Sequence, residues 1–159
     1  MPYVTDGTIG IDLSTVSSSR PYTLGQIVEA SDGSVWQYVH NVTALTQYDC
    51  VAIASGSTAA PVTTTLANAG NKLGFAQVAF AASQNGWVAL QGFGLKVNTD
   101  ASCLPGVPLY TQDTAGSLSD ATASLTHTPV LGVMLIATQA VAGATAANVA
   151  YPMVRRPVV

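Results

Sequence analysis

Short apolar runs separated by turn sequences are the feature of this sequence that most restricts its fold. Residues 24–30 and 35–40 flank Asp32-Gly33, a pair that suits the tight turn of a β-hairpin. No segment keeps an apolar period of 3.6 residues together with helix caps. The pattern predicts an all-β fold, a small antiparallel barrel or sandwich. Further strands are expected at 48–53, 74–80, 87–97, 105–110, 130–137 and 148–154.

The run that begins at Trp87 is the best strand candidate. It follows an Asn-Gly turn sequence, and we expect the indole of Trp87 to lie in the core. Gly92 and Gly94 interrupt the run, which indicates a bulge or a bend. In the preceding hairpin, alternation places Trp36 and Tyr38 together on one face.

The first 20 residues differ in composition from the rest, being rich in Ser, Thr and Gly. Their apolar residues Ile9, Ile11 and Leu13 alternate as in a strand. We therefore expect an extended N-terminal arm over residues 1–20 and a single β domain over 21–159 that folds without it. In this interpretation Ile9, Ile11 and Leu13 contact a partner's sheet edge, while a frayed terminus is the alternative.

Residues 55–70 are a second segment of low complexity, composed mainly of Thr, Ala, Ser and Gly. The segment is long for an internal loop, and long loops commonly carry function. Pro61 within it and Asp113 in a later loop are therefore candidate docking residues.

Charged residues are scarce. Asp, Glu, Lys and Arg make up 8% of the 159 residues, where about 25% is usual. Five basic residues and a net charge of −3 cannot form the cationic face that nucleic acid requires. A neutral surface of Ser, Thr, Asn and Gln repels other copies only weakly, so it favours association.

Catalytic groups are equally few. Cys50 and Cys103 with His40 and Asp49 are the only nucleophile–base material, and no local sequence brings a thiol to the imidazole. Cysteine and histidine lack zinc-ligand spacing, and the aspartates form no calcium loop. We expect no enzyme, no cofactor and no metal. Two buried thiols are the favoured interpretation of the cysteines, although a disulfide stays open.

Two features bear on localisation. The start of the chain lacks the basic and apolar regions of a signal peptide, so synthesis in a cytoplasm is expected. Residues 121–154 carry no charge, and residues 130–150 within them are long enough to cross a bilayer, but the Ala, Gly and Thr content of that stretch and the bracketing Pro129 and Pro152 argue against a membrane span.

One block of the sequence resembles a known family. Gly86-Trp87-Val88-Ala89-Leu90-Gln91-Gly92-Phe93 is similar to a block found in the cement, or head decoration, proteins of tailed bacteriophages. The element Pro105-Gly106-Val107-Pro108-Leu109-Tyr110, the turn Thr114-Ala115-Gly116 and the late Leu131-Gly132-Val133 follow in the order seen in that family. Gly74-Phe75-Ala76-Gln77 resembles the entry to the block, so the resemblance covers about residues 21–140.

The resemblance implies a small β-tulip-like domain that forms homotrimers. Such proteins dock on the outside of the virion, over junctions between subunits of the major capsid protein, and stabilise the shell. They catalyse nothing and have no direct contact with nucleic acid or membrane.

Two other functions stay open at this point. A carbohydrate- or receptor-binding domain on a phage surface would expose Trp36, Tyr38 or Trp87 in a shallow groove. An enzyme would use Cys50 or Cys103 with His40 and would need a reactive thiol of low pKa.

Overall fold

The computed structural model describes residues 3–4, 10–65, 71–121 and 127–155. Within them the all-β prediction is confirmed, since a single 3₁₀ turn, η1 (Ser55–Ser57), is the only helical element. The eleven strands are β1 (Tyr3–Val4), β2 (Ile27–Ala30), β3 (Val35–Asn41), β4 (Cys50–Ile53), β5 (Thr58–Pro61), β6 (Lys72–Ala76), β7 (Asn85–Thr99), β8 (Leu109–Thr111), β9 (Leu118–Ser119), β10 (Pro129–Leu135) and β11 (Gly143–Val154).

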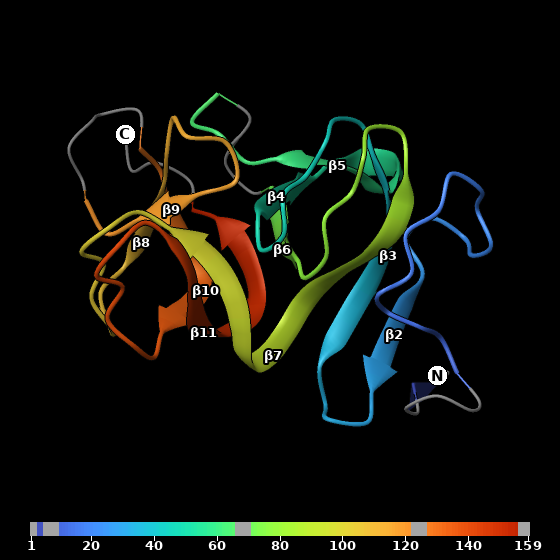
Figure 1. The fold of residues 1–159 in the computed structure, drawn as a ribbon, viewed down its shortest axis with the longest axis horizontal. Helices are drawn as coiled ribbons and strands as arrows, with labels where there is room; N and C mark the ends of the chain where they lie inside the picture. The colour runs from blue at the N-terminus through green and yellow to red at the C-terminus, as the bar shows by residue number, and fades with distance from the viewer. Residues whose placement is uncertain (1–2, 5–9, 66–70, 122–126, 156–159) are drawn as a thin grey trace.

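The long strand β7 joins two halves of the molecule, and it crosses the middle of Figure 1 between β2 and β3 on one side and β8 to β11 on the other. Its first half pairs with both β3 and β6, which completes a circuit of pairings β3–β5–β4–β6–β7. Its second half pairs with β11 and β9, which completes a second circuit β7–β11–β10–β8–β9. Both circuits close on the same strand.

Each circuit has its own apolar core because strand residues alternate between two faces. Val88 and Leu90 point into the first circuit, where they meet Val39 and Val51. The second core fills the space between the second circuit and the other face of β4 and β6. Its members include Cys50, Phe75, Val97, Leu109, Val133 and Val149.

The prediction of a loop over residues 55–70 is wrong for Thr58–Pro61, and residues 66–70 lie outside the described residues. Thr58–Pro61 forms β5, which is inserted between β3 and β4, and the Val62 side chain that follows is fully buried. Gly56 and Ser57 have positive φ angles and reverse the chain between β4 and β5. The sequence Thr-Ala-Ala-Pro has low strand propensity, so tertiary pairing on both sides decides its conformation.

The sheet is also less regular than the antiparallel arrangement expected from hairpins. Three pairs are parallel, namely β1 with β2, β3 with β5, and β7 with β9. The predicted bulge in β7 is present, because Leu95 and Gly92 face Ala147 and Val149 of β11 and leave an additional residue on β7. Gly94 has a φ of +67°, a conformation that glycine adopts at little cost.

Residues 10–24 cover the outer face of β2, β3 and β7. The side chain of Ile11 is 7% exposed and packs with Trp36, Tyr38 and Trp87, and Leu13 is half-buried against the same cluster. Residues 10–16 form turns and bends in place of the strand that Ile9, Ile11 and Leu13 suggested. Ile9 itself lies outside the described residues.

Asn85 attaches this segment to β7. Its backbone exchanges two hydrogen bonds with Ser17, at 2.8 and 2.9 Å. Its side-chain amide donates to the carbonyl oxygens of Ser17, Ser18 and Ser19, at 3.1–3.4 Å. Asn85 is 1% exposed, so no water can replace these partners when the segment is in place. Residues 10–20 therefore contact the chain's own domain closely.

Within the described ranges, no helix is long and apolar enough to span a bilayer.

Candidate interaction surface

The second half of β7 together with β10 and β11 presents an exposed apolar face. Alternation sends Val133, Val149 and Val97 inward, and the residues between them outward. The exposed large side chains of these strands and of the residue after β10 are Phe93, Leu131, Met134, Ile136, Tyr151 and Met153. Large apolar side chains in such numbers on adjacent strands are typical of surfaces that contact another molecule. We call the outward side of β7, β10 and β11 the Phe93 face.

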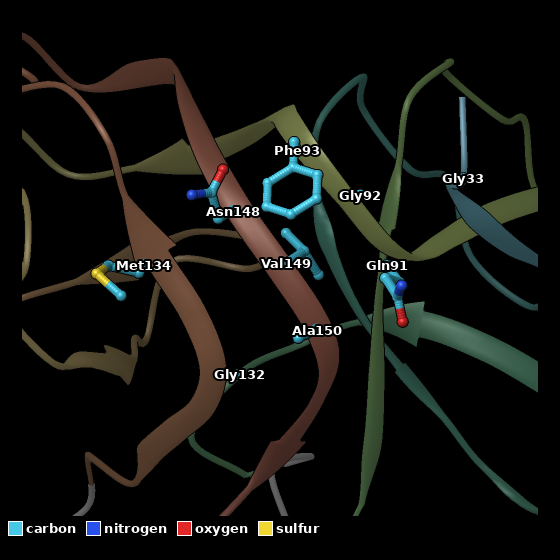
Figure 2. A pocket seen from close by; sticks show the side chains of 9 residues that line it. All are labelled: Gly33, Gln91, Gly92, Phe93, Gly132, Met134, Asn148, Val149 and Ala150. Atoms are coloured by element: carbon cyan, nitrogen blue, oxygen red, sulfur yellow. The ribbon is translucent and has the colours of Figure 1, made fainter.

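Strand register brings the members of the Phe93 face together. Leu131 lies opposite Met153, and Met134 lies opposite Asn148. The bulge in β7 projects Phe93 next to Asn148, whose Oδ1 accepts a hydrogen bond from the Gly94 amide at 3.4 Å. Figure 2 shows the Phe93 ring above Val149, with Met134 on the neighbouring strand. Phe93 is 89% exposed, the largest value among the large apolar side chains.

A pocket of about 330 Å³ opens beside Phe93. Gln91, Phe93, Met134 and Asn148 supply its side-chain walls, and Gly33, Gly92, Gly132, Val149 and Ala150 complete it (Figure 2). A Cβ atom at Gly132 would lie 2.4 Å from the Ala150 carbonyl oxygen, so only glycine allows β10 and β11 to approach here. The pocket is therefore apolar, with two uncharged amides at its edge.

The Phe93 face has charge only at its ends. Lys96 is the single charged residue in the three strands, and it pairs with Ala146 near the end of β10. Arg155 is exposed at the opposite end, where its amide donates to the Pro129 carbonyl oxygen. No carboxylate belongs to these strands. An occupant of the face must therefore be apolar at its centre.

The sequence did not single out Phe93, although it held a signal. The charge-free stretch of residues 121–154, which contains β10 and β11, is the first part of that signal. The aromatic Phe93 between Gly92 and Gly94 is the second part. Only the pairing of β7 with β11 shows that the two parts lie on one face.

The residues predicted to contact a partner are placed differently. Ile11 is a correction, because a side chain buried in its own core cannot contact another subunit, and Leu13 is half-covered by the same core. Pro61 is half-buried in β5 and pairs with Val51. Asp113 is exposed, and its carboxylate accepts a 2.7 Å hydrogen bond from Thr64 Oγ1. The segments that carry Pro61 and Asp113 therefore lie side by side.

The aromatic side chains considered for sugar stacking are core residues. Trp36, Tyr38 and Trp87 are 9%, 1% and 0% exposed. The Tyr38 and Trp87 ring centroids are 5.0 Å apart, and each lies 5.3 Å from that of Tyr22. The prediction that Trp87 belongs to the core is confirmed, and no shallow groove can use these three rings.

Among the described residues, the ionisable side chains of His40 and Lys72 each contact a side-chain amide. His40 Nδ1 lies 3.0 Å from Asn85 Oδ1, and because the Asn85 amide nitrogen already donates elsewhere, the imidazole is the donor. Lys72 Nζ donates to Gln37 Oε1 at 2.5 Å, and burial lowers the pKa of Lys72. No group of three or more His, Cys, Asp or Glu residues in the described ranges could hold a metal ion.

Both cysteines are buried free thiols, as the sequence favoured. Burial raises the pKa of Cys50, helped by the neighbouring Asp49 carboxylate, and burial also raises the pKa of Cys103. The protonated thiol is a poor nucleophile. These positions do not supply the reactive thiol that a Cys–His enzyme requires.

We expect the native protein to resist alkylation at both positions. Mild iodoacetamide treatment near pH 8 should leave the mass unchanged, because both thiols stay protonated and enclosed. The same treatment in 6–8 M urea, a range that unfolds most domains, should add two carbamidomethyl groups. Rapid labelling of either thiol in the native protein, read by mass spectrometry, would reopen the enzyme interpretation.

Neither a scan against protein-family models nor a search of curated proteins finds a match to this chain.

Proposed function

We propose that this chain is a structural virion protein, a cement or decoration protein that binds the outside of a phage capsid at junctions between major capsid protein subunits. The observation that carries the proposal is the Phe93 face, an exposed sheet surface of six large apolar side chains that bears charge only at its ends, because a decoration protein acts as an assembly of copies and needs such a surface between them. Such a surface suits permanent assembly. The resemblance of residues 86–93 and 105–110 to decoration proteins favours a phage capsid as that assembly.

The proposal includes a homotrimer and a location on the outer capsid surface. Many copies that each bridge capsid subunits reinforce a shell by avidity, so no single contact has to be strong. The segments around Pro61 and Asp113 are our candidates for the capsid contact. They lie side by side, and they leave the Phe93 face available for contacts between copies.

Co-sedimentation with capsids tests this function. Expanded capsids that lack the protein, from the virus that encodes it, should bind it saturably and become more resistant to heat. Unexpanded precursor capsids provide the control, since their subunit junctions differ. Asp113→Lys should weaken binding to expanded capsids at least tenfold if the Asp113 segment is the contact. Absence of any binding to expanded capsids would overturn the proposal.

A carbohydrate-binding domain on a phage surface is the second candidate. The observation that favours it is the pocket, where the exposed Phe93 ring stands next to the side-chain amides of Gln91 and Asn148. An aromatic face with nearby amides can stack against and hydrogen-bond a sugar. Binding on a glycan array that disappears in Phe93→Ser would support this candidate.

A further inference from the structure

We infer that the Phe93 face is the surface through which copies of this chain bind one another, and that Phe93 of one copy enters the pocket of the next. The inference deepens the proposed homotrimer by naming its interface. It does not depend on capsid binding.

The extent of the Phe93 face is the first argument. Six large side chains that are 46–89% exposed lie on three hydrogen-bonded strands and the residue after β10. Together they present on the order of several hundred Å² of apolar surface, near the largest patch that a typical monomer leaves exposed. A stable interface buries about 800 Å² on each partner, so the Phe93 face would form the apolar centre of such an interface, with polar residues at its rim.

The lack of charge favours a second copy of this chain as the occupant. The centre of the face carries no charge, so its partner must also be apolar and uncharged. The Phe93 face of a second copy meets this requirement. Charged residues make up only 8% of the whole chain, so little long-range electrostatic repulsion opposes the approach of a second copy.

Shape provides the third argument. Phe93 projects from a glycine bulge and stands at the edge of its own pocket, so each copy carries a knob and a cavity next to each other. A symmetry axis that passes beside Phe93 brings the knob of each copy to the cavity of its neighbour. A pocket of about 330 Å³ is large enough to take a phenyl ring.

Sedimentation velocity over 1–200 µM tests the inference. The wild-type chain should form a species with three times the 16.2 kDa mass of one chain. Phe93→Ser and Met134→Ser should each weaken association at least tenfold. Val42→Ser is the matched control, because Val42 is 52% exposed but lies just after β3, and it should change association less than twofold.

Two further measurements exclude an indirect effect. Circular dichroism melts at 1 µM should show that Phe93→Ser and Met134→Ser stay folded, as expected for exposed positions. Amide hydrogen exchange in β10 and β11 should slow as the wild-type concentration rises. Both ends of the face are cationic, so added salt should preserve or strengthen association by screening like charges.

Specific outcomes overturn the inference. One is a wild-type chain that stays monomeric at 200 µM, and another is an oligomer whose stability Phe93→Ser and Met134→Ser leave unchanged. A monomer that binds glycans through Phe93 would assign the face to the carbohydrate candidate. Self-association without capsid binding would remove the proposed virion function and leave this inference intact.

Discussion

Trp87→Ala should lower the free energy of unfolding by about 3–5 kcal/mol, the range for a fully buried large aromatic residue. The Trp87 indole is 0% exposed, and its strand is hydrogen-bonded on both edges, so the surrounding backbone cannot collapse into the cavity. Its Nε1 has no hydrogen-bond partner in the structure. The loss therefore comes from packing against Tyr22 and Tyr38, with no hydrogen bond removed.

Urea melts of two comparison variants make this measurement specific. Trp87→Phe should cost clearly less than Trp87→Ala, because a phenyl ring refills part of the cavity and removes the unpaired donor. Val42→Ala, at a half-exposed apolar position, should stay within about 0.5 kcal/mol of the wild type. A loss below about 1 kcal/mol for Trp87→Ala would mean that this ring lies outside the core.

Deletion of residues 2–19 should destabilise the domain by on the order of 5 kcal/mol, from the burial and hydrogen bonds it removes. The deletion takes away the buried Ile11 and the half-buried Leu13, and it uncovers the aromatic cluster of Tyr38 and Trp87. It also leaves the buried amide of Asn85 without its three carbonyl partners. This expectation reverses the one from the sequence, in which the domain folds without its arm.

A point variant tests the same contact in the full-length chain. In Asn85→Asp, a carboxylate replaces the donating amide and faces the carbonyl oxygens of Ser17 to Ser19, so we expect a loss of more than about 2 kcal/mol. Gln47→Glu makes the same chemical change at an exposed amide that donates to the Gln77 carbonyl, and it should cost less than about 1 kcal/mol. If the free energy of unfolding of the truncated chain lies within about 1 kcal/mol of that of the full chain, the arm is dispensable. The prediction made from the sequence would then be correct.

Local sequence was sufficient to predict the strands that have a clear alternating or apolar pattern of their own. The hairpin around Asp32-Gly33, the strand from Trp87 with its glycine bulge, and the strand predicted at 130–137 lie close to their predicted positions, whereas the strand predicted at 148–154 already begins at residue 143. In each case alternation or an apolar run is bounded by turn residues. The core position of Trp87 and the buried thiols follow from the same reasoning, because burial depends first on residue type.

Other elements depend on partners that are distant in the sequence. Thr58–Pro61 becomes β5 because β3 and β4 supply hydrogen bonds on both sides. Its alternation with Ile9 and Leu13 predicts that Ile11 belongs to a free strand, but the aromatic cluster of β3 and β7 buries its side chain in the core. The short β9 exists only through its pairing with β7 and β8. Propensity within these segments is too weak to decide their conformation.

The candidate interaction surface, too, could be predicted only in part from the sequence. Composition alone determined that this chain is poor in charge, and it predicts weak repulsion between copies, since both conclusions need only a count of residues. The place of the exposed apolar side chains was decided by tertiary structure. The pairing of β7 with β11, and of β11 with β10, sets Phe93 next to Met134 and places both beside one pocket. The physical reason is that a surface consists of residues from different strands, and their register depends on contacts that no single segment encodes.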